Sequence, residues 1–207
     1  MKKLILTLAL ALVAMVASAE FSVGQLKYEV LASGEVECKG FTSTALAQNP
    51  TSVFIPGSVK SQGTEYKVYS IAANAFKNCT SLKYMYADWG IVEIVHDAFS
   101  GCSALYSVRL PSTIKVIDTY AFYNCSSMSV FGIAATTVPT VASSAFTGMK
   151  KCNVHVATQA AVNAYNNSAY WRNIDLDGSV ARTPNLAYDF VDNNRYYLIH
   201  TDRKSVV

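Results

Sequence analysis

The chain has 207 residues, of which 51% are hydrophobic and 15% are charged. This length is enough for one domain with a sizeable core, or for a linear array of repeats. Lysine and arginine number 17 against 14 aspartates and glutamates, which gives a formal net charge of +3. A balance this close to neutral gives no reason to expect nucleic acid or an anionic membrane as a partner.

Residues 1–19, MKKLILTLALALVAMVASA, predict a secretory signal peptide. Two lysines precede an apolar run from Leu4 to Val16, and Ala-Ser-Ala at 17–19 matches a cleavage site. The apolar run is too short to anchor the chain across a bilayer of ~30 Å. We therefore predict export, with a mature chain that starts at Glu20 and is secreted, periplasmic or at the surface of a bacterium.

Residues 20–70 predict an N-terminal β cap. The segments QLKYEVL and EVECKGF alternate apolar and polar residues on either side of Ser33-Gly34, which favours a hairpin. The inner face of this hairpin would hold Tyr28, Val30, Val36 and Cys38. A second hairpin-like pair is predicted between TSVFIPGSV and TEYKVYSI, around residues 61–63.

An internal repeat occupies residues 71–156. The dipeptide Ala-Phe starts at 75, 98, 121 and 145, at intervals of 23, 23 and 24 residues. An Ile or Val precedes each of these Ala residues by four positions, and a Cys or Met follows it by four. We predict a solenoid of four repeats, because a copy this short can bury its apolar side only by stacking on its neighbours.

The cysteines at 79, 102 and 125 occupy one repeated position, which indicates a buried core residue. Free cysteine packs as a small hydrophobe, and a reactive thiol would be needed once, not at a structural period. Disulfides remain the weaker alternative, and 5 cysteines leave at least one unpaired. No Cys-x-x-Cys pair occurs and the 3 histidines share no phase with the cysteines, so neither a metal site nor a cofactor is predicted.

Each repeat predicts two opposite walls. The spacing Leu105-x-x-Val108-x-Leu110 predicts a short strand with one buried face. The pair Ile114 and Ile117, with its counterparts in the other copies, predicts the second wall. Between the walls, the segment that starts at Asp97 predicts a single helical turn capped by Asp97.

The pattern I-x-x-x-A-F-x-x-C-x-x-L-x-x-V-x-L-P resembles the BspA-like leucine-rich repeat of bacterial surface proteins. Residues 71–156 carry the resemblance most clearly, although Met149 replaces the cysteine in the fourth copy. The resemblance implies a leucine-rich-repeat solenoid, a right-handed β/α superhelix of short parallel strands and single helical turns.

Residues 157–176 predict a short capping helix. Thr158 precedes QAAVNAYNNSAYW, whose apolar residues have helical spacing, and Trp171 would close the last coil. Residues 177–207 form a tail in which FVDNNRYYLIH, at 190–200, resembles FSVGQLKYEVL, at 21–31. Coincidence explains this likeness as well as a second, truncated copy of the N-terminal module does.

Side chains that alternate with the core positions of the repeat strands are predicted to face outward. Tyrosine and arginine are frequent in binding hot spots, although tyrosine is also a good strand former. The candidate protein-binding residues are Lys83, Tyr84, Tyr86, Tyr106, Arg109 and His155.

The sequence contains no G-x-S-x-G motif, phosphate loop or set of acid, base and nucleophile, so an enzyme is not expected. The resemblance implies an exported, non-enzymatic protein-binding protein that acts in cell-surface adhesion or recognition. Host surface and matrix proteins are the candidate ligands. The alternative is a periplasmic or surface scaffold for other exported proteins, without a host ligand.

Overall fold

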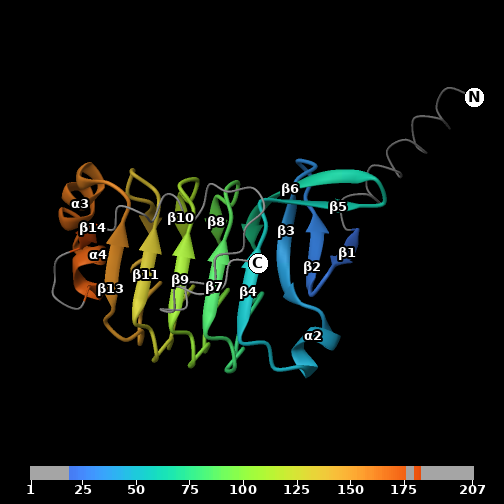
Figure 1. The fold of residues 1–207 in the computed structure, drawn as a ribbon, viewed down its shortest axis with the longest axis horizontal. Helices are drawn as coiled ribbons and strands as arrows, with labels where there is room; N and C mark the ends of the chain where they lie inside the picture. Colours follow the sequence, from blue (N-terminus) through green and yellow to red (C-terminus); the bar gives the residue numbers. More distant parts are fainter. Residues whose placement is uncertain (1–18, 176–179, 183–207) are drawn as a thin grey trace, which may run out of the picture.

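The computed structural model describes residues 19–175 and 180–182 (Figure 1). Its strands form two sheets that run along a stack of coils, one with six strands and one with eight. The predicted leader, apart from Ala19, lies outside the described residues. The same holds for most of the predicted tail, including the segment 190–200, so these predictions stay predictions.

The six-stranded sheet is parallel throughout and has the order β14-β13-β11-β9-β7-β4. It contains the predicted repeat strands: in β9, for example, Val108 and Leu110 are buried and the residue between them is partly exposed. The bounds are β4 Ser52–Ile55, β7 Tyr84–Ala87, β9 Ser107–Leu110, β11 Val130–Ile133, β13 Asn153–Val156 and β14 Ala181–Arg182.

The eight-stranded sheet has the order β1-β2-β3-β6-β8-β10-β12, with β5 paired to β6. Its repeat strands are short and bury Ile94 and Ile117, as the second apolar pair predicts. The bounds are β1 Glu20–Val23, β2 Leu26–Val30, β3 Val36–Phe41, β5 Ser58–Ser61, β6 Thr64–Ile71, β8 Glu93–Ile94, β10 Val116–Ile117 and β12 Thr140–Val141.

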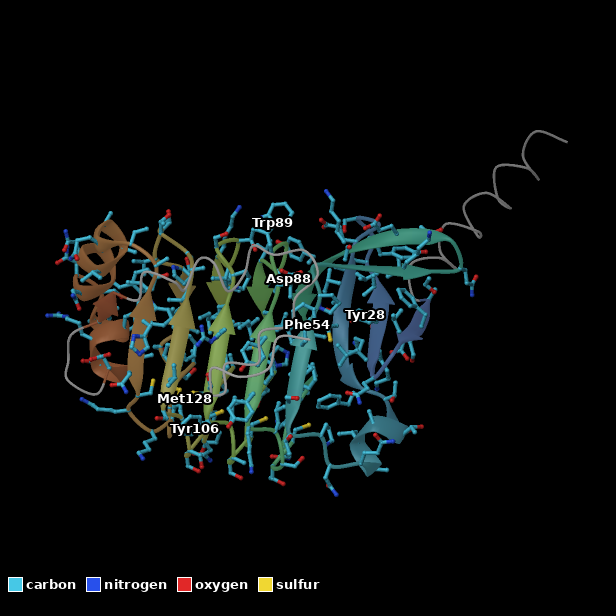
Figure 2. The ribbon with its side chains drawn as sticks, in the orientation of Figure 1. Tyr28, Phe54, Asp88, Trp89, Tyr106 and Met128 are labelled. Carbon is cyan, nitrogen blue, oxygen red and sulfur yellow. The ribbon has the colours of Figure 1, made fainter. Side chains whose placement is uncertain are left out.

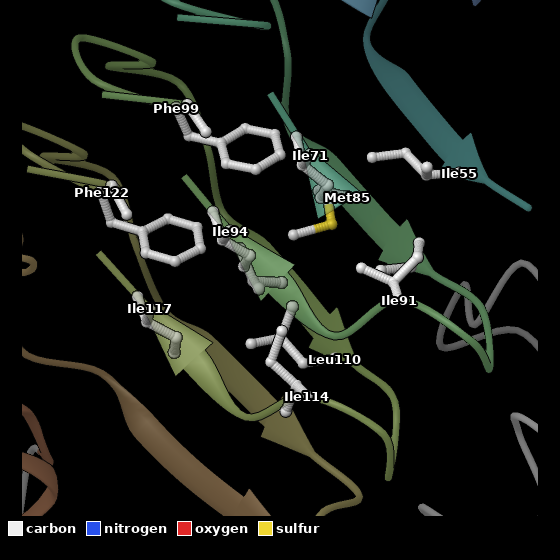
Figure 3. Close-up of a cluster of buried hydrophobic side chains, with 14 of the residues drawn as sticks. Ile55, Ile71, Met85, Ile91, Ile94, Phe99, Leu110, Ile114, Ile117 and Phe122 are labelled. Atoms are coloured by element: carbon white, nitrogen blue, oxygen red, sulfur yellow. The ribbon is translucent and has the colours of Figure 1, made fainter. Parts of the chain in front are cut away.

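The space between the sheets is filled by equivalent side chains from successive coils. The rings of Phe76, Phe99 and Phe122 stack with centroid distances of 5.1 and 5.4 Å. Figure 3 shows Phe99 and Phe122 in equivalent positions, Phe99 beside Ile71 of β6 and Phe122 beside Ile94 of β8. Each coil thus contributes one phenylalanine to a continuous stack, and each ring is buried by the rings of the neighbouring coils, which a single coil could not do by itself.

The cysteine ladder is part of this core, as predicted. Cys102 and Cys125 are fully buried, and their Sγ atoms donate to the carbonyl oxygens of Phe76 and Phe99, at 3.0 and 3.3 Å. All five cysteines are free, and Cys79 is half-buried. Burial raises the pKa of Cys125 to about 12, which keeps this thiol protonated and unreactive.

The segments expected as single helical turns are isolated turns closed by i to i+3 hydrogen bonds, such as Ser100 N–H to the Asp97 carbonyl. The backbone N–H groups of Asp97, Phe99 and Gly101 instead donate to carbonyls of the next coil, at 3.0, 2.8 and 2.8 Å. Asp97 has a φ of 58°, so this turn cannot continue as a right-handed helix. Its side chain bonds Lys77 of the preceding coil at 3.0 Å.

The N-terminal hairpin forms as predicted, with β2 and β3 antiparallel and Tyr28 and Cys38 paired on its buried face. A short helix that was not predicted, α2 (Ser43–Ala47), follows β3 and is capped by the Thr42 hydroxyl, which accepts from Ala45 N–H.

The second predicted hairpin is partly wrong. Strands β5 and β6 pair across the turn at Gln62-Gly63, but β4 leaves them and pairs in parallel with β7. The alternating pattern of Ser52–Ile55 suits any half-buried strand, so it did not reveal which sheet the strand joins. Strand β4 therefore extends the repeat sheet into the range assigned to the N-terminal cap.

The C-terminal segment contains two short helices where one was expected, α3 (Gln159–Asn166) and α4 (Ala169–Ile174). Thr158 caps α3 as predicted, since its hydroxyl accepts from Ala161 N–H at 3.1 Å. Ser168 has an extended backbone and separates the helices. This break lets Trp171 turn inward, where it is fully buried.

Candidate binding surface

The outward side chains of the six-stranded sheet form two rows that cross the strands. Strand pairing puts Tyr86 directly beside Arg109, and Tyr84 beside Ser107, in the register that the repeat spacing predicts. The first row contains Phe54, Tyr86, Arg109, Gly132 and His155, and the second contains Ser52, Tyr84, Ser107, Val130 and Asn153. We call this surface the outer repeat face.

The six candidate residues all lie on the outer repeat face or at the edge where its strands begin. Lys83 and Tyr106 occupy this edge, and the Tyr106 N–H donates to the Lys83 carbonyl at 2.8 Å. Tyr106 is 47% exposed, while Tyr84 and Tyr86 are half-buried. Figure 2 shows Tyr106 near the lower edge of the sheet and Phe54 higher on β4.

The aromatic residues gather on β4, on β7 and just before β9. The rings of Tyr84 and Tyr106 meet edge to face, with centroids 6.2 Å apart. Phe54 is 40% exposed and lies beside Tyr86 in the first row. Aromatic side chains bring a large contact area at a low cost in conformational entropy, so this part of the face suits burial against a partner.

An arginine and a histidine lie toward the other end of the first row. Arg109 and His155 are both half-buried, and Gly132 lies between them. The pKa of His155 is lowered, first by burial and then by the positive charge of Arg109, whereas Asp175 opposes this shift. Asp175 is itself buried, and its Oδ2 accepts from Val154 N–H at 2.8 Å.

One residue of the outer repeat face, Phe54, was missed as a candidate. Phe54 was missed because β4 was assigned to a cap hairpin, although Val53-x-Ile55-Pro56 matches Val108-x-Leu110-Pro111 and was the available signal. Ser107 also differs from expectation: the register directs it outward, yet it is only 7% exposed. Across the described residues, no group of three His, Cys, Asp or Glu is placed to hold a metal ion.

The repeats also match a known protein family. The model for the BspA type leucine rich repeat region matches residues 50–189, with 6 copies. The chain belongs to the BspA-type leucine-rich repeat family. The match begins just before β4, which supports the assignment of this strand to the BspA-type repeats. The number of copies in the match, 6, equals the number of strands in the repeat sheet.

Solved structures of other leucine-rich repeat proteins have the same fold. One from Bacteroides ovatus is 25% identical over 65% of this chain and 34% of its own, with a TM-score of 0.55. One from Bacteroides capillosus is 22% identical over 66% of this chain and 96% of its own, with a TM-score of 0.57. The match thus spans about a third of the first of these leucine-rich repeat proteins.

No curated protein matches the chain. In the described part of the chain, no helix is long and apolar enough to cross a membrane. Repeat solenoids of this kind present extended surfaces that suit protein binding, which makes the outer repeat face the first place to look for a ligand.

Proposed function

We propose that this protein is an exported, non-enzymatic repeat protein that binds another protein through the outer repeat face, in cell-surface adhesion or recognition. The observation that carries the proposal is the cluster of aromatic residues on two adjacent strands and at the start of the third: Phe54 on β4, Tyr84 and Tyr86 on β7, and Tyr106 just before β9.

The core does not need these aromatic residues. In β7 and β9 the core is made by the buried apolar residues Met85, Ala87, Val108 and Leu110, which alternate with the positions that the register directs outward. Strand-forming tendency alone would be met by smaller β-branched residues. Tyrosine and arginine side by side in one row are typical of interface hot spots.

The double variant Tyr86→Ala with Arg109→Ala tests the role of the face. Its melting temperature should stay within a few degrees of the parent, because surface truncations change stability little. Pull-downs from host matrix and surface extracts should lose the proteins that the parent retains. Tyr120→Ala, which truncates another exposed tyrosine, outside the two sheets, is the matched control and should retain them.

If the double variant and the parent capture the same proteins, the ligand does not bind at Tyr86 and Arg109, and the binding site must lie elsewhere on the molecule. The alternative is a periplasmic or surface scaffold for other exported proteins. Protease shaving of intact cells cuts only a protein at the cell surface, so it separates recognition of an external ligand from the periplasmic form of this alternative.

Export has its own test. Glu20 begins β1, so cleavage after Ala19 would keep every residue of the first strand and would remove only the bond from Val30 N–H to the Ala19 carbonyl, at 3.2 Å. N-terminal sequencing of the exported protein should find Glu20 first, and an intact Met1 would refute export with cleavage.

A further inference from the structure

The corner of the coil that follows β7 carries an exposed tryptophan. Trp89 is 65% exposed, more than any other large hydrophobic residue in the described part of the chain. Figure 2 shows it at the upper edge of the stack of coils, whereas Tyr106 lies near the lower edge. Tryptophan side chains are highly buried on average, so this exposure needs an explanation outside the core.

The repeat scaffold does not require a tryptophan at this corner. Strand β7 pairs in register with β4 and β9, which aligns Trp89 with Gly57 in one neighbouring coil and with Ser112 in the other. The preceding residue, Asp88, takes the place of a proline that both neighbouring coils have. One coil therefore departs from the repeat at two successive positions, and the departure introduces an indole and a carboxylate.

The backbone of this corner is held from both sides. A Cβ added at Gly57 would collide with the Trp89 carbonyl oxygen, so the two coils approach as closely as only a glycine allows. On the other side, the Thr113 hydroxyl accepts from Gly90 N–H at 3.0 Å and donates to the Ile91 carbonyl at 2.8 Å. A side chain on a fixed backbone binds a ligand with a smaller loss of conformational entropy.

The indole of Trp89 has small neighbours along the edge. Gly57 has no side chain, and Ser112 has a short one and is exposed. No ring of another described aromatic residue contacts Trp89. The flat face of the indole can therefore be covered by a ligand from outside.

The carboxylate of Asp88 is fixed beside the tryptophan. Its Oδ1 accepts from Trp89 N–H at 2.7 Å. None of the hydrogen bonds between described residues uses Oδ2 of Asp88, so this oxygen can accept from a hydroxyl group of a ligand. The same negative charge would repel an acidic ligand.

This combination fits a sugar better than a protein. The central anchor of a protein interface is surrounded by further contacts that exclude water, whereas the neighbours of Trp89 on this edge are small or polar. A pyranose ring has a face of C–H groups, which packs on an aromatic ring, and a rim of hydroxyl groups, which donate to a carboxylate. One indole with one carboxylate beside it is therefore complementary to a single sugar unit.

We infer that the corner formed by Asp88 and Trp89 binds a neutral glycan, with one sugar ring stacked on the indole and its hydroxyl groups bonded to the carboxylate. The site is separate from the outer repeat face and adds a second kind of ligand to the protein partner proposed there. Because a glycan repeats its sugar units, several copies of the protein on one cell would bind it with increased avidity.

A printed array of neutral and acidic glycans, probed with the purified protein, tests the inference. The parent should bind neutral glycans and Trp89→Ala should lose them. The melting temperature of this variant should stay within a few degrees of the parent, because the side chain is exposed. Tyr170→Ala truncates a ring of α4 that is 44% exposed, and as the matched control it should bind as the parent does.

A soluble copy of the best-bound glycan then gives affinities by calorimetric titration. Trp89→Ala should bind it at least about tenfold more weakly than the parent. Asp88→Asn should also weaken it, by a smaller factor, and should improve binding of acidic glycans on the array. The tryptophan emission of the parent should shift to shorter wavelength on binding, because Trp171 is already buried and only Trp89 changes its surroundings.

Two results would overturn the inference. The first is that no neutral glycan on the array binds the parent, or that Trp89→Ala binds the same glycans equally well. The second is that Trp89→Ala differs from the parent and from Tyr170→Ala only in the proteins it captures from host surface extracts, which would make the indole an anchor for a protein. The proposed binding at the outer repeat face would stand in either case, since it depends on other residues.

Discussion

The two ends of the solenoid close the same core in different ways. At the C-terminal end the closure depends on side chains: Trp171 packs against Phe131 and Phe146, with centroids 5.5 Å away in each case, and against Tyr165 at 5.1 Å. At the N-terminal end the backbone continues the sheet, since β6 pairs with β3, β3 with β2, and β2 with β1.

This difference shows that a solenoid end needs its apolar surface covered, whatever covers it. A cap made of one aromatic cluster places much of its stabilisation in few side chains. A cap made of added strands spreads it over backbone hydrogen bonds and many smaller contacts. The two ends should therefore respond differently to single substitutions.

Truncation of the C-terminal aromatic cluster should have the largest effect. Trp171→Ala should lower the free energy of unfolding by about 3–5 kcal/mol, because it removes a large buried ring and leaves a cavity. Urea unfolding measures the loss, and hydrogen exchange should show β13 and α3 losing protection before β2 and β3. Tyr170→Ala, which truncates a ring that is 44% exposed, should change stability by less than about 0.5 kcal/mol. Equal loss of protection at both ends would show that the caps are not independent.

At the N-terminal end, the close approach of two backbones should be the sensitive point. Gly40 lies in β3 with a φ of 95°, and an added Cβ would collide with the carbonyl oxygen of Ala75 in the first coil. Gly34 has a similar φ of 84°, but nothing lies within 4 Å of its added Cβ. Both alanine variants carry the same backbone strain, so Gly40→Ala should be less stable than Gly34→Ala by roughly 1–3 kcal/mol. Equal midpoints in urea would mean that the cap can move away from the first coil without cost.

The coils between the two caps should give a smaller effect that depends on pH. The pKa of Cys125 is raised to about 12 by burial, against ~8.5 for an unfolded thiol. Above pH 8.5 the unfolded chain releases this proton and the folded chain keeps it, so stability falls as pH rises. When the pH is raised from 8 to 10, the free energy of unfolding of the parent should therefore fall by about 1–2 kcal/mol more than that of Cys125→Ala. Identical pH profiles from urea unfolding would show that this thiol is not buried in solution.

Much of the repeat block could be predicted from the sequence, because its signals are repeated. The interval of 23 residues placed Cys102 and Cys125 in the core, and the spacing around Val108 and Leu110 placed the buried face of β9. When the same kind of residue recurs at the same position of every copy, one structural role, such as burial in the core, accounts for all of them. The candidate face followed from the same spacing, since residues between buried strand positions point outward.

The sequence by itself determined the solenoid, its ladder of apolar residues, the register of Tyr86 and Arg109, and the capping roles of Thr158 and Trp171. Only the tertiary structure decided that β4 joins the repeat sheet and brings Phe54 beside Tyr86. It also decided that the turn segments bond to the next coil instead of forming helices. The physical reason is the same in both cases: a strand pattern specifies which face is buried but not which neighbour is paired, and backbone N–H groups take whichever carbonyl the stacked coils present.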